Sequence, residues 1–169
     1  MRNSPLWRNK EPLNLPGGMT GFDNEETKMP TYWGTPFSKI CVGMMVDQQT
    51  NFFVIDKRAS SLYSLIADGQ YRNTSPGRDT WKSLIGSEAS LQGVCNREGF
   101  NTVCENGQKA RIGILSNNEN DCNSCDSRIG FGAAGFPDDH NTCGNAADGR
   151  FSPDNGDKRI KALGFILVQ

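Results

Sequence analysis

The chain has 169 residues, of which 36% are hydrophobic, 19 are Gly and 8 are Pro, a composition typical of a loop-rich globular protein. A net charge of −1 and a pI of 5.8 give no reason to expect binding to nucleic acid or to an anionic membrane. No apolar run approaches the ~20 residues of a membrane helix, so we expect no membrane insertion. The length predicts one domain over residues 1–169.

The first half of the chain predicts short elements separated by loops. Residues 1–36 are polar and rich in Pro and Gly, which predicts an irregular N-terminal arm packed on the domain. Two apolar runs, 40–46 and 51–55, predict a β-hairpin. Residues 60–69 and 78–87 each predict a short helix that ends near a glycine.

The second half contains a long segment without periodicity between two predicted strands. Residues 109–115 predict a strand, and the apolar run 160–168 predicts a buried one. Residues 116–158 show no periodic element, and so long an irregular segment usually serves function or holds an ion. The fold class expected is therefore α+β, a loop-rich single domain with short strands and two or three short helices.

The six cysteines are an even number, which predicts three disulfides and a secreted, extracellular protein. The alternative is a reduced protein with buried thiols. Residues 1–14 lack the apolar core of a signal peptide, so we expect a mature form. Cys122 and Cys125 have C-x-x-C spacing, but neighbouring carboxylates disfavour a reactive thiolate, and Cys95 with Cys104 is a poor second pair for zinc. We expect each of the two to bond outside this motif.

An acidic, oxygen-rich region follows the strand at 109–115. Eight acidic residues and two arginines between positions 117 and 157 give a local net charge of −6. Calcium takes about six to eight oxygen ligands from carboxylates, amides and carbonyls. The region offers Asn117, Asn118, Glu119, Asn120, Asp121, Asn123 and Asp126 before the glycine-rich bend, and Asp138, Asp139, Asn141 and Asn145 after it. The alternative is a solvated loop that uses Asn and Asp for turns, which is the interpretation favoured for Asp154 and Asp157.

Catalytic motifs are not evident. His140 is the only histidine, and no G-x-S-x-G elbow or nucleotide-binding glycine motif occurs. The acids are too numerous for a pairing argument to select two of them for glycoside hydrolysis. We therefore do not expect an enzyme.

The motifs in the second half resemble those of a known family. CNSCDSRIG (122–130), FPD (136–138), CGN (143–145) and the closing apolar strand resemble the carbohydrate-binding half of the intelectins. These are secreted, calcium-dependent lectins built on a fibrinogen-like domain. KARIGILSNNE (109–119) extends the resemblance, which covers residues 109–169. The size, cysteine number and calcium-type loop also resemble those of galactose-specific sea anemone lectins.

The resemblance implies a set of site residues. It places Ca²⁺ ligands at Asn118, Asn123, Asp126 and Asp138, while Cys125 falls where the family has a Glu ligand. Glu119 or Asp121 is expected to supply that missing carboxylate. The resemblance also implies a Cys41–Cys143 disulfide. The remaining residues expected around the sugar are Asn117, Asp121, Asp139, His140, Phe131 and Phe136, with Trp33 as a further aromatic candidate.

The function implied is calcium-dependent binding of galactose-terminated glycans. Two vicinal hydroxyls of the sugar would coordinate an ion that the carboxylates hold. A single site of this kind binds weakly, and the chain has no internal repeat, so a homo-oligomer, most simply a dimer, is expected to supply avidity. The alternative is a fibrinogen-like structural or protein-recognition module in which calcium only orders a loop.

Overall fold

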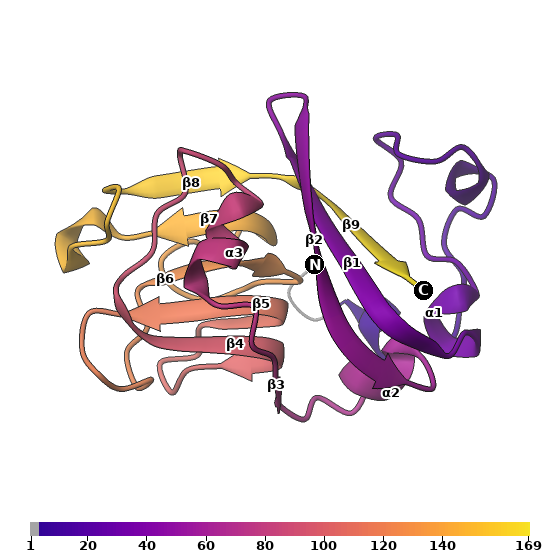
Figure 1. Cartoon of the computed structure of the whole chain (residues 1–169), viewed down its shortest axis with the longest axis horizontal. Helices are drawn as coiled ribbons and strands as arrows, with labels where there is room; N and C mark the ends of the chain where they lie inside the picture. Colours follow the sequence, from indigo (N-terminus) through magenta and orange to yellow (C-terminus); the bar gives the residue numbers. More distant parts are fainter. Residues whose placement is uncertain (1–3) are drawn as a thin grey trace.

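The computed structural model describes residues 4–169, which fold mainly into β-strands (Figure 1). The strands are β1 Phe37–Val46, β2 Gln49–Ala59, β3 Arg72–Asn73, β4 Val94–Val103, β5 Lys109–Asn117, β6 Ser127–Phe131, β7 Cys143–Ala147, β8 Lys158–Lys161 and β9 Leu163–Val168. The helices are α1 Thr31–Gly34, α2 Leu62–Ile66 and α3 Arg78–Ser83, with 3-10 turns η1 Pro5–Trp7, η2 Gly17–Met19 and η3 Gly149–Phe151.

The strands form two antiparallel sheets. The small sheet has the order β2-β1-β9, and the large sheet has the order β3-β4-β5-β6-β7-β8. The expected α+β, fibrinogen-like class is therefore wrong, because the described part of the chain is β-rich and its helices are few and short. The error arises mainly from β6 and β7, which lie in the segment 116–158 that was expected to be irregular.

Most of the local predictions outside that segment are confirmed. The hairpin is formed by β1 and β2, joined at Asp47 and Gln48, whose φ angles of 48° and 68° are those of a two-residue hairpin turn. Both predicted helices are present as α2 and α3. The predicted strand 109–115 is β5. The single buried strand expected at 160–168 is wrong, because the run divides into β8 and β9 around Ala162 and its residues are half-buried or exposed.

The main core lies between the two sheets. Ile40, Val42 and Met44 project from one face of β1 and are fully buried, and Ile112 and Ile129 face them from the large sheet. The short helices α2 and α3 add buried side chains to the same cluster. The small sheet therefore uses one face for the core and leaves the other face outward.

The central strands β5, β6 and β7 of the large sheet are buried on both faces. The second face of this sheet carries glycines in register, Gly113 opposite Gly130 and Gly130 opposite Gly144. A Cβ on Gly130 would lie 2.8 Å from the carbonyl oxygen of Ile112 and 2.9 Å from the Cβ of Ala110, so the backbone and side chains approach closely there. All five residues of β6 are buried, which removes the alternation that would have identified it as a strand.

The N-terminal segment packs beside the small sheet. Residues 4–36 contain η1, η2 and α1 and a single bridge between Leu13 and Lys28. The first three residues of the predicted arm lie outside the described residues. No helix in the described part of the chain is long and apolar enough to cross a membrane.

Candidate functional site

Two acidic loops meet at one end of the large sheet. In the register of the sheet, Ser127 of β6 pairs with Ser116 of β5 and with Ala147 of β7. The residues just outside these pairs therefore become neighbours. The backbone N–H of Asp148 donates to the carbonyl of Asp126 at 3.1 Å.

The carboxylate of Asp126 is the most unusual group in this region. Its residue is only 6% exposed, and no hydrogen bond to its carboxylate is found among the described residues. Burial, followed by the nearby negative charges of Glu119 and Asp148, raises the pKa of Asp126 to about 6. The charges of Glu119 and Asp148 thus act on Asp126, and we call these three residues the carboxylate site. As the structure stands, their oxygens are not close enough together to form a ready-made metal site; among the described residues only the sulfur atoms of Cys95, Cys104 and Cys125 are.

Arg150 supplies the main opposing charge at the carboxylate site, and Arg159 adds a smaller one at Asp148. Arg150 lies 2.6 Å from Asp148, and this hydrogen bond lowers the pKa of Asp148. Arg150 is 74% exposed at its side chain, so water weakens its effect. Asp126 and Glu119 remain without an ion pair among the described residues, which leaves a net negative site.

Hydrogen bonds within residues 117–124 shape the loop itself. Asn117 is fully buried and donates to the backbone carbonyl of Asp121 at 3.0 Å, while its side-chain oxygen accepts from the N–H of Asn118. The Asp121 carboxylate accepts from the N–H of Asn123 at 2.9 Å. Asn117 and Asp121 therefore hold the loop conformation, and Asn118 and Asn123 are exposed.

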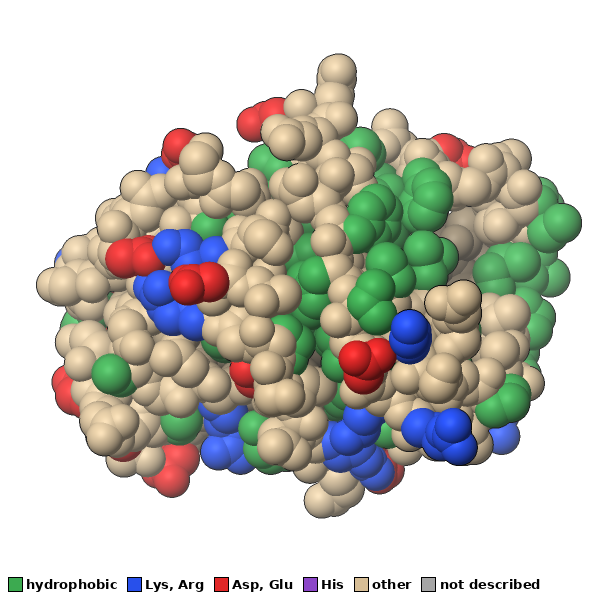
Figure 2. Space-filling model, in the orientation of Figure 1, with side chains coloured by type: hydrophobic (Ala, Val, Ile, Leu, Met, Phe, Trp, Pro, Cys, Tyr) green, Lys and Arg blue, Asp and Glu red, His purple; other side chains and the backbone are tan. Residues whose placement is uncertain are grey.

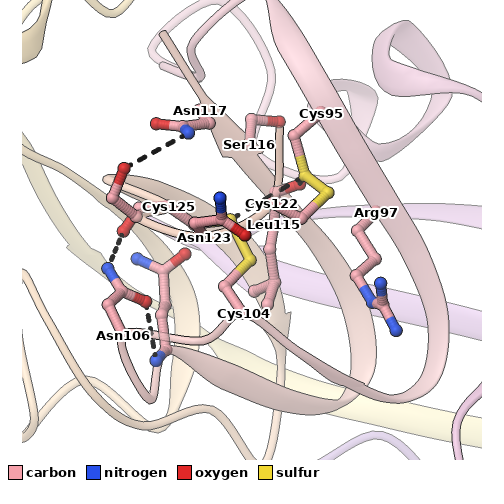
Figure 3. The surroundings of a disulfide bond; sticks show 12 residues. Cys95, Arg97, Cys104, Asn106, Leu115, Ser116, Asn117, Cys122, Asn123 and Cys125 are labelled. Carbon is pink, nitrogen blue, oxygen red and sulfur yellow. Dashed lines mark hydrogen bonds between the residues drawn. A yellow bond between two sulfur atoms is a disulfide. The ribbon is translucent and has the colours of Figure 1, made fainter. Parts of the chain in front are cut away.

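Two adjacent disulfides attach this loop to β4 and to the residue that follows β4 (Figure 3). Cys95 of β4 bonds to Cys122, and Cys104 bonds to Cys125. The prediction that Cys122 and Cys125 each bond outside their C-x-x-C motif is confirmed. Asn106 adds a hydrogen bond of 2.8 Å to the carbonyl of Cys125, so the residue before Asp126 is held on two sides.

The sulfur atoms of the two disulfides are close together. Those of Cys95, Cys104 and Cys125 lie within 4.8 Å of one another, a group that could hold a metal ion. A metal needs thiolates, and each of these sulfurs is already bonded to another sulfur. This cluster is therefore a structural clamp in the oxidised protein.

The predicted Cys41–Cys143 disulfide is wrong, because both residues are free cysteines. Cys143 is in β7 and faces inward, where a Cβ on Gly164 would come within 2.7 Å of its sulfur. Burial raises the pKa of Cys143 to about 12. Cys41 lies on the outward face of β1, so the small sheet itself separates the two thiols.

The second group of predicted ligands belongs to a loop held by Arg128. This arginine is 1% exposed and donates to the carbonyls of Gly135, Phe136 and Asn141 at 3.0, 2.9 and 3.1 Å, and to that of Asp138. Burial in this carbonyl cage lowers the pKa of Arg128 to about 10. Residues 135–141 contain no helix or strand, and the hydrogen bonds from the guanidinium hold their backbone in place.

Asp138 is engaged in the same loop. Its carboxylate accepts the N–H groups of His140 and Asn141 at 2.9 and 3.2 Å. Burial alone would raise the pKa of Asp138, but these hydrogen bonds and the charge of Arg128 lower it. No contact joins Asp138 to Asp126 among the described residues, so the structure does not bring together the pair expected to share one ion.

The other residues expected to contact the sugar differ in their exposure to solvent. Phe131 is 3% exposed in the core and cannot contact a ligand. Phe136 is 38% exposed, and its ring centre lies 6.2 Å from that of Phe151. Asp139 accepts from the N–H of Gly135 at 2.6 Å, and His140 is exposed. Trp33 lies in α1 on the N-terminal segment.

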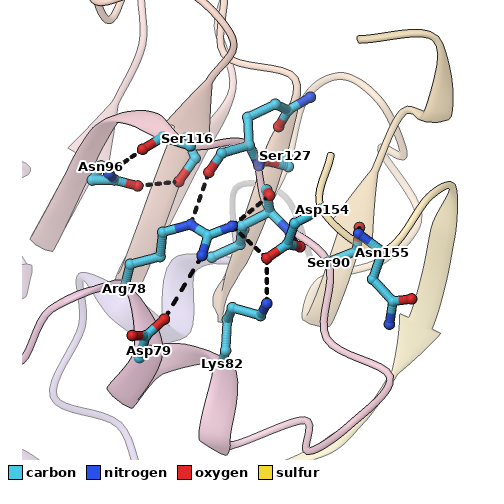
Figure 4. A network of polar contacts seen from close by, with 12 residues as sticks. Arg78, Asp79, Lys82, Ser90, Asn96, Ser116, Ser127, Asp154 and Asn155 are labelled. Carbon is cyan, nitrogen blue, oxygen red and sulfur yellow. Dashed lines mark hydrogen bonds and ion pairs between the residues drawn. The ribbon is translucent and has the colours of Figure 1, made fainter. Parts of the chain in front are cut away.

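Asp154 lies in an exposed turn before β8, as expected, and its carboxylate also links that turn to α3 (Figure 4). Its carboxylate is 2.6 Å from Arg78 of α3, contacts Lys82, and accepts the N–H of Leu91 at 3.0 Å. Burial opposes its ionisation, but the hydrogen bonds from Lys82, Leu91 and Arg78 outweigh burial and lower the pKa of Asp154 to about 2. The turn is confirmed, whereas the ion pairs of Asp154 were not predicted.

Asp148 and Phe151 were missed by the sequence reasoning. Both lie next to β7, which was not expected as a strand. Had residues 143–147 been paired with 127–131, the register would have placed Asp148 beside Asp126. The missing signal is thus strand pairing rather than composition.

Comparison of the chain with protein-family models, with curated proteins and with solved structures finds no match.

Proposed function

We propose that this protein binds a calcium ion at the carboxylate site and uses it to bind galactose-terminated glycans. The observation that carries the proposal is Asp126, a residue that is only 6% exposed, whose carboxylate receives no hydrogen bond among the described residues and whose pKa is raised by burial and by the nearby charges of Glu119 and Asp148. Such a group is costly in a folded protein unless a cation neutralises it. A divalent cation would supply the missing charge.

The donor set supports a hard cation. Asp126, Glu119 and Asp148 offer carboxylate oxygens, and Asn118 and Asn123 offer amide oxygens from the exposed loop. Oxygen-only sets suit calcium or magnesium rather than zinc. Relative to the ligands implied by the resemblance to intelectins, Asp148 takes the place of Asp138 in this proposal.

The proposed activity is binding rather than catalysis. Calcium would supply open coordination positions for two vicinal hydroxyls of the sugar, such as O3 and O4 of galactose. The carboxylates would orient these hydroxyls by accepting their hydrogen bonds. Phe136, with Phe151 beside it, offers an exposed ring for the apolar side of the sugar. We include secretion in the proposal, and the two disulfides fit an oxidising compartment.

Calorimetry with methyl galactoside tests this function. We expect heat of binding in calcium and none in chelator, and we expect Asp126→Asn to remove it. Asp79→Asn is the matched control, because the Asp79 side chain is 98% exposed and lies outside the site. Calcium binding without any sugar binding would support the alternative in which calcium only orders the loop. Sugar binding that persists in chelator would disprove the proposal.

A further inference from the structure

The outward face of the small sheet is apolar across all three strands. Residues that alternate with the buried Ile40, Val42 and Met44 point away from the core. The register of β1 with β2 and β9 arranges them in two rows across the sheet, Val54–Cys41–Leu167 and Phe52–Gly43–Phe165. We call these residues the apolar face.

This face is solvent-accessible. Phe52, Val54 and Leu167 are 41%, 53% and 42% exposed. Phe22 of the N-terminal segment stacks edge-on against Phe52 and Phe165, with ring centres 5.6 and 5.1 Å away, and is itself 61% exposed. Figure 2 shows hydrophobic side chains gathered over this sheet. Of the nine large hydrophobic side chains exposed in the described residues, four are here.

The dimensions of the face fit a small dimer interface. Three strands spaced by ~4.8 Å are about 15 Å across, and the six residues of β9 limit the shared length to about 20 Å, at ~3.4 Å per residue. With the adjoining N-terminal residues, the face stays below the roughly 800 Å² that each partner contributes to a typical interface, in the range of weak complexes. A patch of this kind on a monomer commonly marks an interaction site.

The position of Cys41 indicates which partner fits. Cys41 is a free, half-buried cysteine on the central strand, with Val54 on one side and Leu167 on the other. The four cysteines of the clamp are paired, and Cys143, although also half-buried, packs against the core. A two-fold axis that runs over β1 would place apolar rows against apolar rows and each Cys41 opposite its own copy.

We propose that the apolar face is a homodimer interface, with a second copy of this chain as its occupant and Cys41 at its centre. This inference goes beyond the proposed function and does not require the carboxylate site. Burial of the aromatic and aliphatic rows supplies the association free energy. The dimer expected from the sequence thus has a specific surface.

The central thiols allow a covalent form of the same dimer. Two Cys41 thiols would lose two protons and two electrons to form one disulfide. A low-molecular-weight disulfide such as oxidised glutathione accepts these electrons and yields two free thiols. The apolar contact comes first, and the disulfide then traps it.

Sedimentation equilibrium under reducing conditions tests the non-covalent contact. At roughly 50 μM, a concentration well above a micromolar Kd, we expect the wild-type chain at twice its mass of 18.6 kDa. The double variant Val54→Lys/Leu167→Lys should be monomeric, with a Kd raised at least ~100-fold by charges placed in the interface. Val103→Lys, which changes a residue of 44% exposure in the other sheet, should leave the dimer intact.

Oxidation tests the position of Cys41. In oxidised glutathione, a non-reducing gel should show a dimer for wild type and none for Cys41→Ser, which should still sediment as a dimer. Melting curves establish that each variant is folded, and a misfolded double variant is replaced by Val54→Lys alone. A monomeric wild type would mean that the face meets another partner or stays in water, and would overturn the proposal. So would a dimer that survives both lysines.

Discussion

At the residue scale, two aspartates with the same chemistry have opposite surroundings. Asp126 is buried beside other carboxylates, whereas Asp154 accepts hydrogen bonds from two cations and a backbone amide. Burial therefore raises the pKa of one, and its partners lower the pKa of the other. The ionised form of Asp126 is therefore unfavourable in the folded protein, which is a common feature of binding sites.

Replacing Asp126 should stabilise the calcium-free protein. Its pKa rises from 3.8 to about 6 on folding, so the stability it contributes is full below pH ~4 and is lost as the pH rises through 6. At pH 7 in chelator we expect Asp126→Asn to gain about 1–3 kcal/mol in free energy of unfolding. Urea denaturation at pH 7 and at pH 4 measures it, and an equal difference from wild type at both would contradict the assignment.

Replacing Asp154 should have the opposite effect. Its pKa is lowered to about 2 on folding, so its contribution is present above pH ~4 and is lost as the pH falls through 2. The side chain is 36% exposed, so after allowance for solvent screening we expect Asp154→Asn to cost on the order of 1–2 kcal/mol at pH 7. Thermal melts compare it with Asp79→Asn. A variant as stable as wild type would show that the ion pairs contribute nothing.

At the element scale, the close approach of strands depends on glycine. Gly130→Ala should destabilise the protein by about 1–3 kcal/mol, because the new Cβ would overlap the Ile112 carbonyl and the Ala110 side chain. Gly93→Ala is the control, since nothing lies within 4 Å of its Cβ position. Chemical denaturation gives both values. Equal effects of the two substitutions would show that the contact has room to relax.

The elements that could be predicted are those with a local signal. The hairpin of β1 and β2 has apolar runs around a turn, and β5 has a clear apolar run. In contrast, β6 and β7 are buried on both faces and contain Gly, Ala and Asn, so neither alternation nor β-propensity marks them. Pairing across the sheet, which is a non-local property, decides these strands.

The candidate site was predictable in part for the same reason. Asp126 and Glu119 stand in one acidic run, and the sequence places them in the site. Asp148 joins them only through the register of β6 with β7. Asp138 has the right chemistry, but its carboxylate already accepts two backbone N–H groups. Its backbone carbonyl accepts a hydrogen bond from Arg128.

At the scale of the whole molecule, the two proposed surfaces lie on different sheets. The carboxylate site is at the end of the large sheet, and the apolar face is on the outside of the small sheet. A dimer through the apolar face would therefore carry two separate sugar sites. Two linked sites bind a cell surface far more tightly than one.

Cell agglutination should depend on both surfaces. Val54→Lys/Leu167→Lys is expected to lose agglutination of red cells while keeping calcium-dependent binding of methyl galactoside in solution. Val103→Lys should keep both activities. Agglutination by a variant shown to be monomeric would mean that avidity does not depend on the dimer formed through the apolar face.

Crystals soaked in calcium and galactose would show whether Asp126 holds the calcium ion that binds the sugar. We predict anomalous density for one ion within about 2.3–2.6 Å of the Asp126 carboxylate, with two vicinal sugar hydroxyls on the same ion. Density for a sugar bound elsewhere without an ion, or an ion site that excludes Asp126, would contradict the account.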